Sequence, residues 1–162
     1  MFKELVKRST DDLVRGYWFS IIKCGPEYEK NELGIGKEIL MKAVARSCGS
    51  TVSIIRDLLK ETGDLGTAAQ KCKTGQKTMN FFIKNLKQPT PLTIEKVFNS
   101  LIKITKIKGN NAQTDKQSII ENLLLESSKE ETKFIIRWVE GNLNISAGEK
   151  TMQKALISAL FE

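Results

Sequence analysis

The sequence contains no histidine, and it has only three cysteines and three prolines among its 162 residues. Histidine is the commonest general base and the commonest metal ligand in proteins, so its absence removes the usual side chain for both roles. Cys24, Cys48 and Cys72 are too far apart for a zinc knuckle, and an odd number does not suit a disulfide framework. We interpret them as reduced thiols of an intracellular protein.

Long apolar runs are also missing. No stretch approaches the length of a membrane span, and the start at Lys3-Glu4 does not resemble a signal peptide, so no membrane partner is expected. The hydrophobic content of 40% and the charged content of 28% are those of a globular chain. A chain of this length suits one domain and can bury a substantial core.

Acidic residues are scarce in the middle of the chain. Residues 71–108 hold nine lysines against Glu95 alone, whereas the segments on either side are nearly balanced. A run of this kind is often a solvated face, but its one-sided charge favours a polyanionic partner. Arginine is scarce as well, with five residues against 21 lysines. Guanine edges are read best by the flat guanidinium fork, so this balance indicates phosphate contact with little base readout.

Helical periodicity covers almost the whole chain, and we predict an all-α fold, a compact domain of seven or eight helices with short connections. Ser9 or its neighbours start a first helix, and Thr93 starts a long one. Ser128 and Glu131 have the spacing of a capping box. The remaining predicted helices cover residues 37–47, 51–62, 65–71 and 115–125, followed by a last helix after Ser146 in which Met152, Ala155, Leu156, Ala159 and Leu160 face inward.

Two segments break this periodicity. Residues 72–78 are polar and basic, and we predict an exposed loop there. Residues 79–91 contain Pro89 and Pro91 near the cluster Phe81-Phe82-Ile83, and either a short hairpin or an irregular arm fits them.

The stretch from Gly141 to Thr151 joins two helical patterns. Ser146 and Glu149 have the spacing of a second capping box, which would begin a helix at Ala147 and leave several backbone N–H groups free. Such a helix start favours a phosphate oxygen, and small residues let a bulky partner approach the backbone. The alternative interpretation is an ordinary capped turn.

A faint internal repeat links this stretch to an earlier one. Leu33-Gly34-Ile35-Gly36 has a counterpart in Leu143-Asn144-Ile145-Ser146, and each stretch follows a helix of similar sequence. The spacings differ by a few residues, so coincidence stays open as an explanation. If the repeat is genuine, two loops of small residues each lead into a helix, and together they could straddle a duplex backbone.

Enzymatic motifs are absent from the chain. The pair Gly34 and Gly36 lacks the third glycine and the preceding strand of a dinucleotide-binding loop, and it is closer to the turn of a helix-hairpin-helix. No phosphate-binding Gly-x-x-x-x-Gly-Lys motif, zinc-ligand set or nucleophile–base pair occurs. We therefore expect no catalysis by this chain alone, and no cofactor.

Several short motifs resemble a known family when they are taken in order. They are Gly25-Pro26-Glu27-Tyr28-Glu29, Glu32-Leu33-Gly34-Ile35-Gly36, Gly63-Asp64-Leu65-Gly66, Ala69-Gln70-Lys71, Pro91-Leu92-Thr93, Phe134-Ile135-Ile136-Arg137 and the stretch from Gly141. Together they resemble the N-terminal DNA-binding domain of eukaryotic and archaeal ATP-dependent DNA ligases of the DNA ligase I type. The similarity covers nearly the whole chain. It implies one domain over residues 1–162 that lacks the first helices of the family's domain and ends before the catalytic domains.

The resemblance implies an all-α domain with pseudo-two-fold halves that grips nicked duplex DNA across the minor groove. The family's basic loop falls on Lys73-Thr74-Gly75-Gln76-Lys77, and its Leu-Arg-Ile-Gly loop falls on Leu143-Asn144-Ile145-Ser146, where arginine and glycine are replaced. The expected charged contacts are Lys37, Lys71, Lys73, Lys77 and Lys150. The expected backbone and neutral contacts are Gly34, Gly36, Thr74, Gln76, Gly141, Asn142, Asn144, Ser146, Ala147 and Gly148.

The sequence thus predicts a sequence-independent DNA-binding module of a ligase that acts in replication and repair. The resemblance implies nuclear localisation, a monomer, and the catalytic domains of the same parent protein as partners. ATP and Mg²⁺ would belong to that parent enzyme, since the Lys-x-Asp-Gly adenylation motif does not occur here. Two alternatives stay open: a helical protein–protein scaffold whose lysine face is only solvated, and a complete enzyme that would become adenylated by ATP.

Overall fold

The computed structural model describes residues 2–29, 31–80, 92–145 and 147–161, and for residues 8 and 76–80 it describes the backbone alone. Over these residues the chain forms nine α-helices and one 3-10 helix, and no strand, which confirms the predicted all-α class. The elements are α1 (Phe2–Arg8), α2 (Thr10–Ser20), η1 (Glu27–Glu29), α3 (Lys37–Ser47), α4 (Val52–Thr62), α5 (Leu65–Asn80), α6 (Ile94–Lys106), α7 (Ala112–Glu126), α8 (Lys129–Val139) and α9 (Glu149–Phe161).

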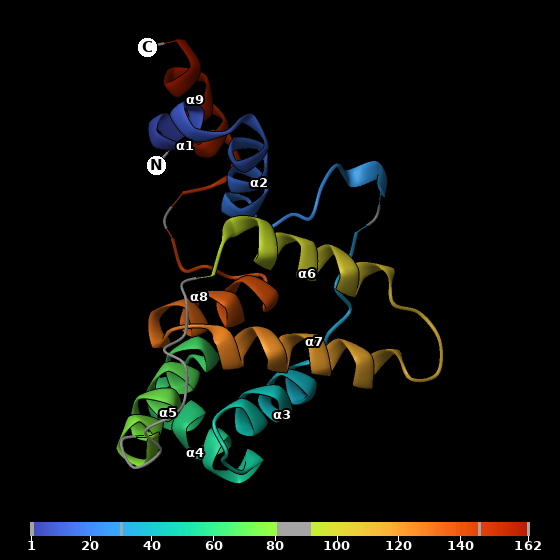
Figure 1. Ribbon diagram of the computed structural model, residues 1–162, viewed down its shortest axis with the longest axis vertical. Coiled ribbons are helices and arrows are strands. Elements are labelled where there is room, and N and C mark those ends of the chain that lie inside the picture. Colours follow the sequence, from blue (N-terminus) through green and yellow to red (C-terminus); the bar gives the residue numbers. More distant parts are fainter. Residues whose placement is uncertain (1, 30, 81–91, 146, 162) are drawn as a thin grey trace.

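The helices are stacked in three groups along the long axis of the molecule (Figure 1). Helices α1, α2 and α9 form one end, where the two chain termini lie close together. Helices α6, α7 and α8 cross the middle, and α3, α4 and α5 form the other end. Helix α5 packs along α8, and α3 packs along α7, so the middle and lower groups share one core.

The core lies between α3, α4, α5, α6, α7 and α8. Its fully buried side chains include Leu40, Ile55, Leu101, Ile120 and Ile136, which recur at helical spacing on the inner faces of their helices. Burying one such side chain contributes about 1.5–3 kcal/mol. The predicted helical periodicity therefore corresponds to a genuine buried face.

Side-chain caps fix several helix starts as the sequence predicts. The hydroxyls of Ser9 and Thr93 accept hydrogen bonds from the amides of Asp12 and Lys96, at 3.4 and 3.1 Å. Ser128 forms the predicted capping box, in which its own amide also donates to the Glu131 carboxylate at 2.7 Å. No helix of the described chain is long and apolar enough to cross a membrane.

Helix α5 is longer than predicted. It continues from Leu65 through residues 72–78 to Asn80, so the expectation of an exposed loop over 72–78 is wrong. The stretch contains no proline, and its one glycine, Gly75, does not end a helix by itself. The Lys73 ammonium also holds this part of α5 against the end of α7, because it donates to the Leu124 carbonyl. The predicted hairpin or arm lies mostly in residues 81–91, outside the described residues.

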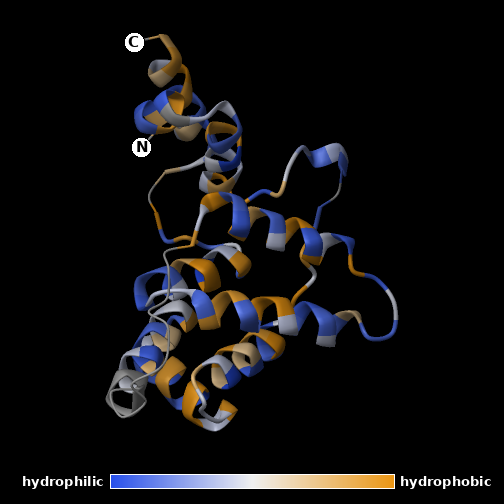
Figure 2. Ribbon diagram, viewed as in Figure 1, coloured by the Kyte–Doolittle hydropathy of each residue, from blue (hydrophilic) through white to orange (hydrophobic). Residues whose placement is uncertain are grey.

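The last helix, α9, is also placed differently from expectation. It packs on α1 and α2, and none of its described residues is buried. Met152 and Leu156 are half-buried, whereas Ala155 is exposed and Leu160 is 51% exposed. The predicted inward face is therefore wrong for part of the helix, although Figure 2 shows hydrophobic positions along α9 as it does along the central helices. Amphipathic spacing identifies an apolar face but not how fully a neighbour covers it.

Candidate nucleic-acid interface

The link before α3 is held in place by helix α7. The buried Lys116 side chain donates to the Leu33 carbonyl at 2.6 Å, and Gln113 donates to the Gly34 carbonyl at 3.2 Å. Gly34 has a φ of 56°, a left-handed conformation that glycine adopts at little cost. The loop therefore leaves Gly36 at a fixed position, directly before the first residue of α3.

The link after α8 begins with a tight helix end. Gly141, with a φ of 79°, donates to the Trp138 carbonyl, and Asn142 donates to the Arg137 carbonyl at 2.9 Å. This pair of bonds is a Schellman ending, which requires the left-handed residue that glycine supplies. The Asn142 side chain then accepts from the Asn144 amide at 3.0 Å, and the loop is exposed at Asn144 and Ile145.

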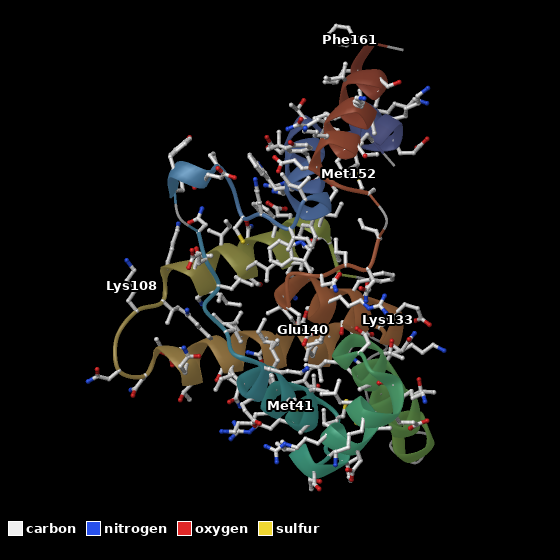
Figure 3. The ribbon with its side chains drawn as sticks, turned by 180° about the vertical axis from the view of Figure 1, so that it is seen from behind. Met41, Lys108, Lys133, Glu140, Met152 and Phe161 are labelled. Carbon is white, nitrogen blue, oxygen red and sulfur yellow. The ribbon has the colours of Figure 1, made fainter. Side chains whose placement is uncertain are left out.

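The two links line one cavity of about 500 Å³, to which Gly34, Gly141 and Glu140 contribute. Glu140 lies centrally in the molecule in Figure 3, at the end of α8. Burial raises the pKa of its carboxyl, and the neighbouring Lys37 ammonium opposes that rise. Lys23, which also lines this cavity, donates to Glu149 at 3.1 Å, so the start of α9 is tied to the same region. The fold thus brings together loops that lie far apart in the sequence.

The faint internal repeat has a counterpart in the backbone. Gly34 and Asn144, which occupy matching positions in the two sequences, both adopt the left-handed conformation, with φ of 56° and 52°. Asparagine is the residue type other than glycine that tolerates this region best. Each loop then leads into a helix, α3 or α9, after a small residue. The preceding helices also meet, since the Trp138 indole donates to the Phe19 carbonyl at 2.9 Å.

The helix that was predicted to begin at Ala147 begins later. Helix α9 starts at Glu149, so that predicted start is wrong, and the Glu149 carboxylate accepts from Lys23. The predicted capping box itself depends on Ser146. Gly148 takes the position before the helix: its carbonyl accepts from the amides of Thr151 and Met152, at 3.0 and 3.1 Å. Ser146 itself lies outside the described residues. Ala147 is half-buried, and Gly148 and Lys150 are exposed.

The predicted basic contacts of α5 are only partly free. Lys71 pairs with Glu61 at 2.7 Å on the surface. Lys73 is half-buried, and its ammonium donates to the Leu124 carbonyl and to the Ser127 hydroxyl, while burial lowers its pKa. The Thr74 hydroxyl donates to the Gln70 carbonyl at 2.8 Å within the exposed face of the helix. The side chains of Gln76 and Lys77 lie outside the described residues.

The fold divides the lysine-rich segment between separate places. Lys71 and Lys73 lie on α5, whereas Lys103 and Lys106 are exposed on α6, and Lys108 follows them. Figure 3 shows Lys108 at the far end of α6, on the opposite side of the molecule from α5. The lysines of this segment whose side chains the structure describes therefore do not form a single basic surface, although the charge is continuous along the sequence.

The α5 lysines and the glycine loops lie at opposite ends of α8. Asp64, just before α5, pairs with Arg137 near the end of α8, whereas Lys73 reaches Ser127, just before α8 begins. Helix α8 has 11 residues, which corresponds to a length of about 16 Å. The predicted contacts thus form two groups, one at each end of this helix.

Sequence reasoning missed the residues that hold these groups in place. Lys116 and Gln113 belong to α7, and their spacing in the sequence gave no sign that they bind a distant loop. The ion pair between Asp64 and Arg137 was not predicted from the sequence either. Burial raises the pKa of Asp64, but hydrogen bonds from Arg137 and Thr67 outweigh that effect, so its pKa lies below the usual value.

The family model and the relatives that match this chain all belong to DNA ligases. The family model described as "DNA ligase N terminus" matches residues 1–157. DNA ligase 1 of Dictyostelium discoideum is 37% identical over 99% of this chain, which corresponds to 13% of its own length. DNA ligase 1 of Schizosaccharomyces pombe is 38% identical over 98% of this chain, which corresponds to 20% of its own length. An archaeal DNA ligase from Pyrobaculum islandicum is 30% identical over 98% of the chain and 26% of its own length.

The chain is therefore a DNA ligase domain, and within that class it belongs to the DNA ligase N-terminus family. It spans about a fifth or less of the length of the eukaryotic DNA ligase 1 proteins named above. The predicted resemblance to eukaryotic and archaeal ATP-dependent DNA ligases is confirmed.

Proposed function

We propose that this chain binds nicked duplex DNA without regard to sequence, across the minor groove and along the phosphate backbone. It would do so as the DNA-binding domain of an ATP-dependent DNA ligase that acts in replication and repair. Its other partners would be the catalytic domains of the same parent protein, which would carry the ATP and Mg²⁺ chemistry. We further propose that it acts as a monomer in the nucleus.

The observation that carries this proposal is the open space around two glycines at helix starts. Gly36 has an ordinary extended conformation, with φ of −79° and ψ of 158°, and a Cβ placed on it would meet no atom within 4 Å. The space at Gly148 is equally open, and its φ is not positive. Neither a steric contact nor a left-handed backbone within the described chain requires glycine at either position, whereas Gly34 and Gly141 are explained by their left-handed backbone.

A phosphate group is the partner that suits such a position. The first amides of a helix lack intrahelical acceptors and carry the positive end of the helix dipole, so an anion is stabilised there. By contrast, α4 and α6 are capped by Thr51 and Thr93, whose hydroxyls already accept from the helix amides. Gly36 makes no side-chain cap, so its helix start remains open to an outside acceptor.

The arginines support binding that ignores base sequence. Each arginine side chain that the structure describes pairs with a carboxylate. The pairs are Arg15 with Asp12 at 3.0 Å, Arg46 with Glu121 at 3.9 Å, Arg56 with Glu38 at 2.8 Å, and Arg137 with Asp64 at 3.0 Å. None of these guanidinium groups is left unpaired to read guanine, and lysine serves phosphates well as a point charge.

The two groups of contacts have a spacing that DNA can match. They are separated by about the 16 Å length of α8, and phosphates along one strand rise by about 3.4 Å each, so the two groups would fall roughly five nucleotides apart. Contacts on both sides of a strand break would hold its two ends in line, as a domain that serves ligation requires.

A salt titration of DNA binding tests the proposal. The dissociation constant for a labelled nicked duplex should rise tenfold or more between about 50 and 200 mM salt, because bound lysines release counterions from the phosphates. Two duplexes of unrelated sequence should bind within about twofold of each other. A flat salt response, or no binding at low salt, would overturn the proposal.

The scaffold alternative retains one favourable observation. Hydrophobic side chains are exposed on the α1, α2 and α9 end of the molecule, including Val14 at 49% and Phe161 at 86%. Charge reversal separates the two functions: Lys77→Glu with Lys150→Glu should abolish DNA binding, while a scaffold would keep its protein partner. The matched control is Lys60→Glu, on the exposed face of α4, which should leave DNA binding unchanged.

A further inference from the structure

A second cavity, of about 280 Å³, lies where the end of α2 and the start of α6 meet α8 (Figure 1). Its walls are largely apolar and include the rings of Phe19 and Trp138, whose centroids are 5.2 Å apart. Val97 on α6 and Leu143 after α8 also line it. A dry apolar cavity of about 150 Å³ can hold a benzene ring, so this one has room for a side chain as large as phenylalanine.

The cavity opens to solvent beside two uncovered apolar side chains. Phe134 on α8 is 49% exposed although it lines the cavity, and Ile94 on α6 is 37% exposed. At protein interfaces, aromatic or aliphatic side chains of one partner anchor the complex by filling pockets of this kind on the other. The open rim therefore suits an anchor side chain that enters from another molecule.

The polar groups of the walls are already bonded within the chain. The Trp138 indole donates to the Phe19 carbonyl at 2.9 Å. The two carboxylate oxygens of Glu131 accept from the amides of Ser128 and Leu92, at 2.7 and 3.3 Å. The part of an occupant that enters the cavity is therefore held by apolar contact and needs no hydrogen-bonding group of its own.

The charge at the mouth of the cavity is negative. Glu130 and Glu131 line it, whereas no lysine or arginine is among the described residues that do. Glu130 pairs with Lys129 at 3.5 Å on the surface, a solvent-exposed contact that a competing cation can replace at little cost. A phosphate would be repelled here, and a lysine or arginine of a partner would be attracted.

We propose that this cavity is a docking site for a basic peptide segment of a partner protein. A phenylalanine or leucine of the peptide fills the cavity, and a neighbouring lysine or arginine pairs with Glu130. Successive residues of an extended peptide are about 3.3 Å apart, so a cation one or two positions from the anchor reaches the rim. The inference does not rest on DNA binding, because the carboxylates at the mouth disfavour a nucleic acid there.

Calorimetric titration with the synthetic hexapeptide acetyl-Lys-Lys-Phe-Leu-Lys-Lys-amide tests the site. The peptide should bind saturably, with one molecule per chain. One matched probe carries Ser-Ser in place of Phe-Leu, and another carries glutamate in place of each lysine. The serine probe should bind at least about tenfold more weakly because it lacks the anchor, and the glutamate probe should bind more weakly because its charge is reversed.

Two substitutions at exposed positions locate the binding on the protein. Phe134→Ala should weaken the lysine peptide at least about tenfold, and Glu130→Lys should weaken it about twofold to fivefold. The matched controls are Leu125→Ala, at an exposed apolar position of α7, and Asp57→Lys, at an exposed position of α4. Both controls should leave peptide affinity unchanged, and circular dichroism should show that all four variants are folded.

Three results would overturn the inference. They are the absence of saturable binding of the lysine peptide up to about 1 mM, equal affinity for the phenylalanine and serine probes, and unchanged peptide affinity in Phe134→Ala. Sedimentation that reveals a dimer, which Phe134→Ala dissociates, would overturn it as well, since a second copy of the chain would then fill the cavity. Phe134→Ala should keep its affinity for nicked duplex, so the outcome is independent of the DNA-binding proposal.

Discussion

The close approach of α5 and α8 at Gly66 yields a sharp prediction for stability. A Cβ at Gly66 would lie 2.6 Å from the Lys133 carbonyl oxygen and 2.8 Å from the Arg137 Cγ. Because backbone cannot move aside as a flexible side chain can, Gly66→Ala should push the two helices apart. Overpacking of this kind costs about 1–3 kcal/mol, and the better helix propensity of alanine offsets up to about 1 kcal/mol. We expect a net loss of about 2 kcal/mol.

Gly75→Ala provides the matched control in the same helix. A Cβ at Gly75 meets nothing within 4 Å, so the identical substitution should stabilise the protein by about 0.5–1 kcal/mol. Urea unfolding followed by the fluorescence of Trp18 and Trp138 measures both changes. Midpoints that shift in the same direction, or an unchanged midpoint for Gly66→Ala, would refute the packing of α5 on α8 described above.

Three further substitutions test the groups that hold the site. Asp64→Asn should cost about 2 kcal/mol at pH 7, because it weakens a charged hydrogen bond to Arg137. Folding lowers the pKa of Asp64, so the stabilisation by its carboxylate is present above the usual aspartate pKa and is lost as the pH falls through the folded value. The difference in unfolding free energy between the unaltered protein and Asp64→Asn should therefore be smaller at pH 3 than at pH 7. Ser128→Ala removes the capping box and should lower the urea midpoint by an amount equivalent to about 1 kcal/mol, and an unchanged midpoint would contradict the cap. Lys116→Met leaves the Leu33 carbonyl without its donor, so hydrogen exchange at the 33–36 amides should accelerate while exchange in α8 does not.

The elements that the sequence predicts best are those with local causes. Apolar spacing in 37–47 and the caps at Thr93 and Ser128 each depend on residues within a few positions, and the structure confirms them. The helical path of residues 72–78 was missed because its support is distant: Lys73 is held by the Leu124 carbonyl, more than fifty positions along the chain. No periodicity within the segment itself indicates such a contact.

In the candidate site, too, the features with local causes were predicted and those that depend on distant residues were not. The matching of Gly34 with Asn144 was visible as a weak repeat, and the backbone gives both residues the same left-handed conformation. The cavity shared by the two loops could not be predicted, since its lining comes from the links after α2 and after α8, which are far apart in the sequence. The predicted start of α9 was wrong, and Glu149 at its true start binds Lys23, a residue 126 positions away in the sequence. Ion pairs between distant residues leave no local pattern in a sequence.

The two open glycines allow the most direct test of DNA binding. Gly36→Leu combined with Gly148→Leu adds bulk at positions where a Cβ meets no other atom, so the fold should be retained. The urea midpoint should fall by an amount equivalent to about 1 kcal/mol, because glycine is the better N-cap residue at Gly36. The control is Ser53→Leu, which adds comparable bulk in the first turn of α4. In fluorescence anisotropy with a labelled nicked duplex at low salt, the double variant should bind at least about tenfold more weakly, because it blocks the approach of phosphates to the helix amides. Equal affinity for the double variant, the control and the unaltered protein would contradict the proposed phosphate contacts at these helix starts.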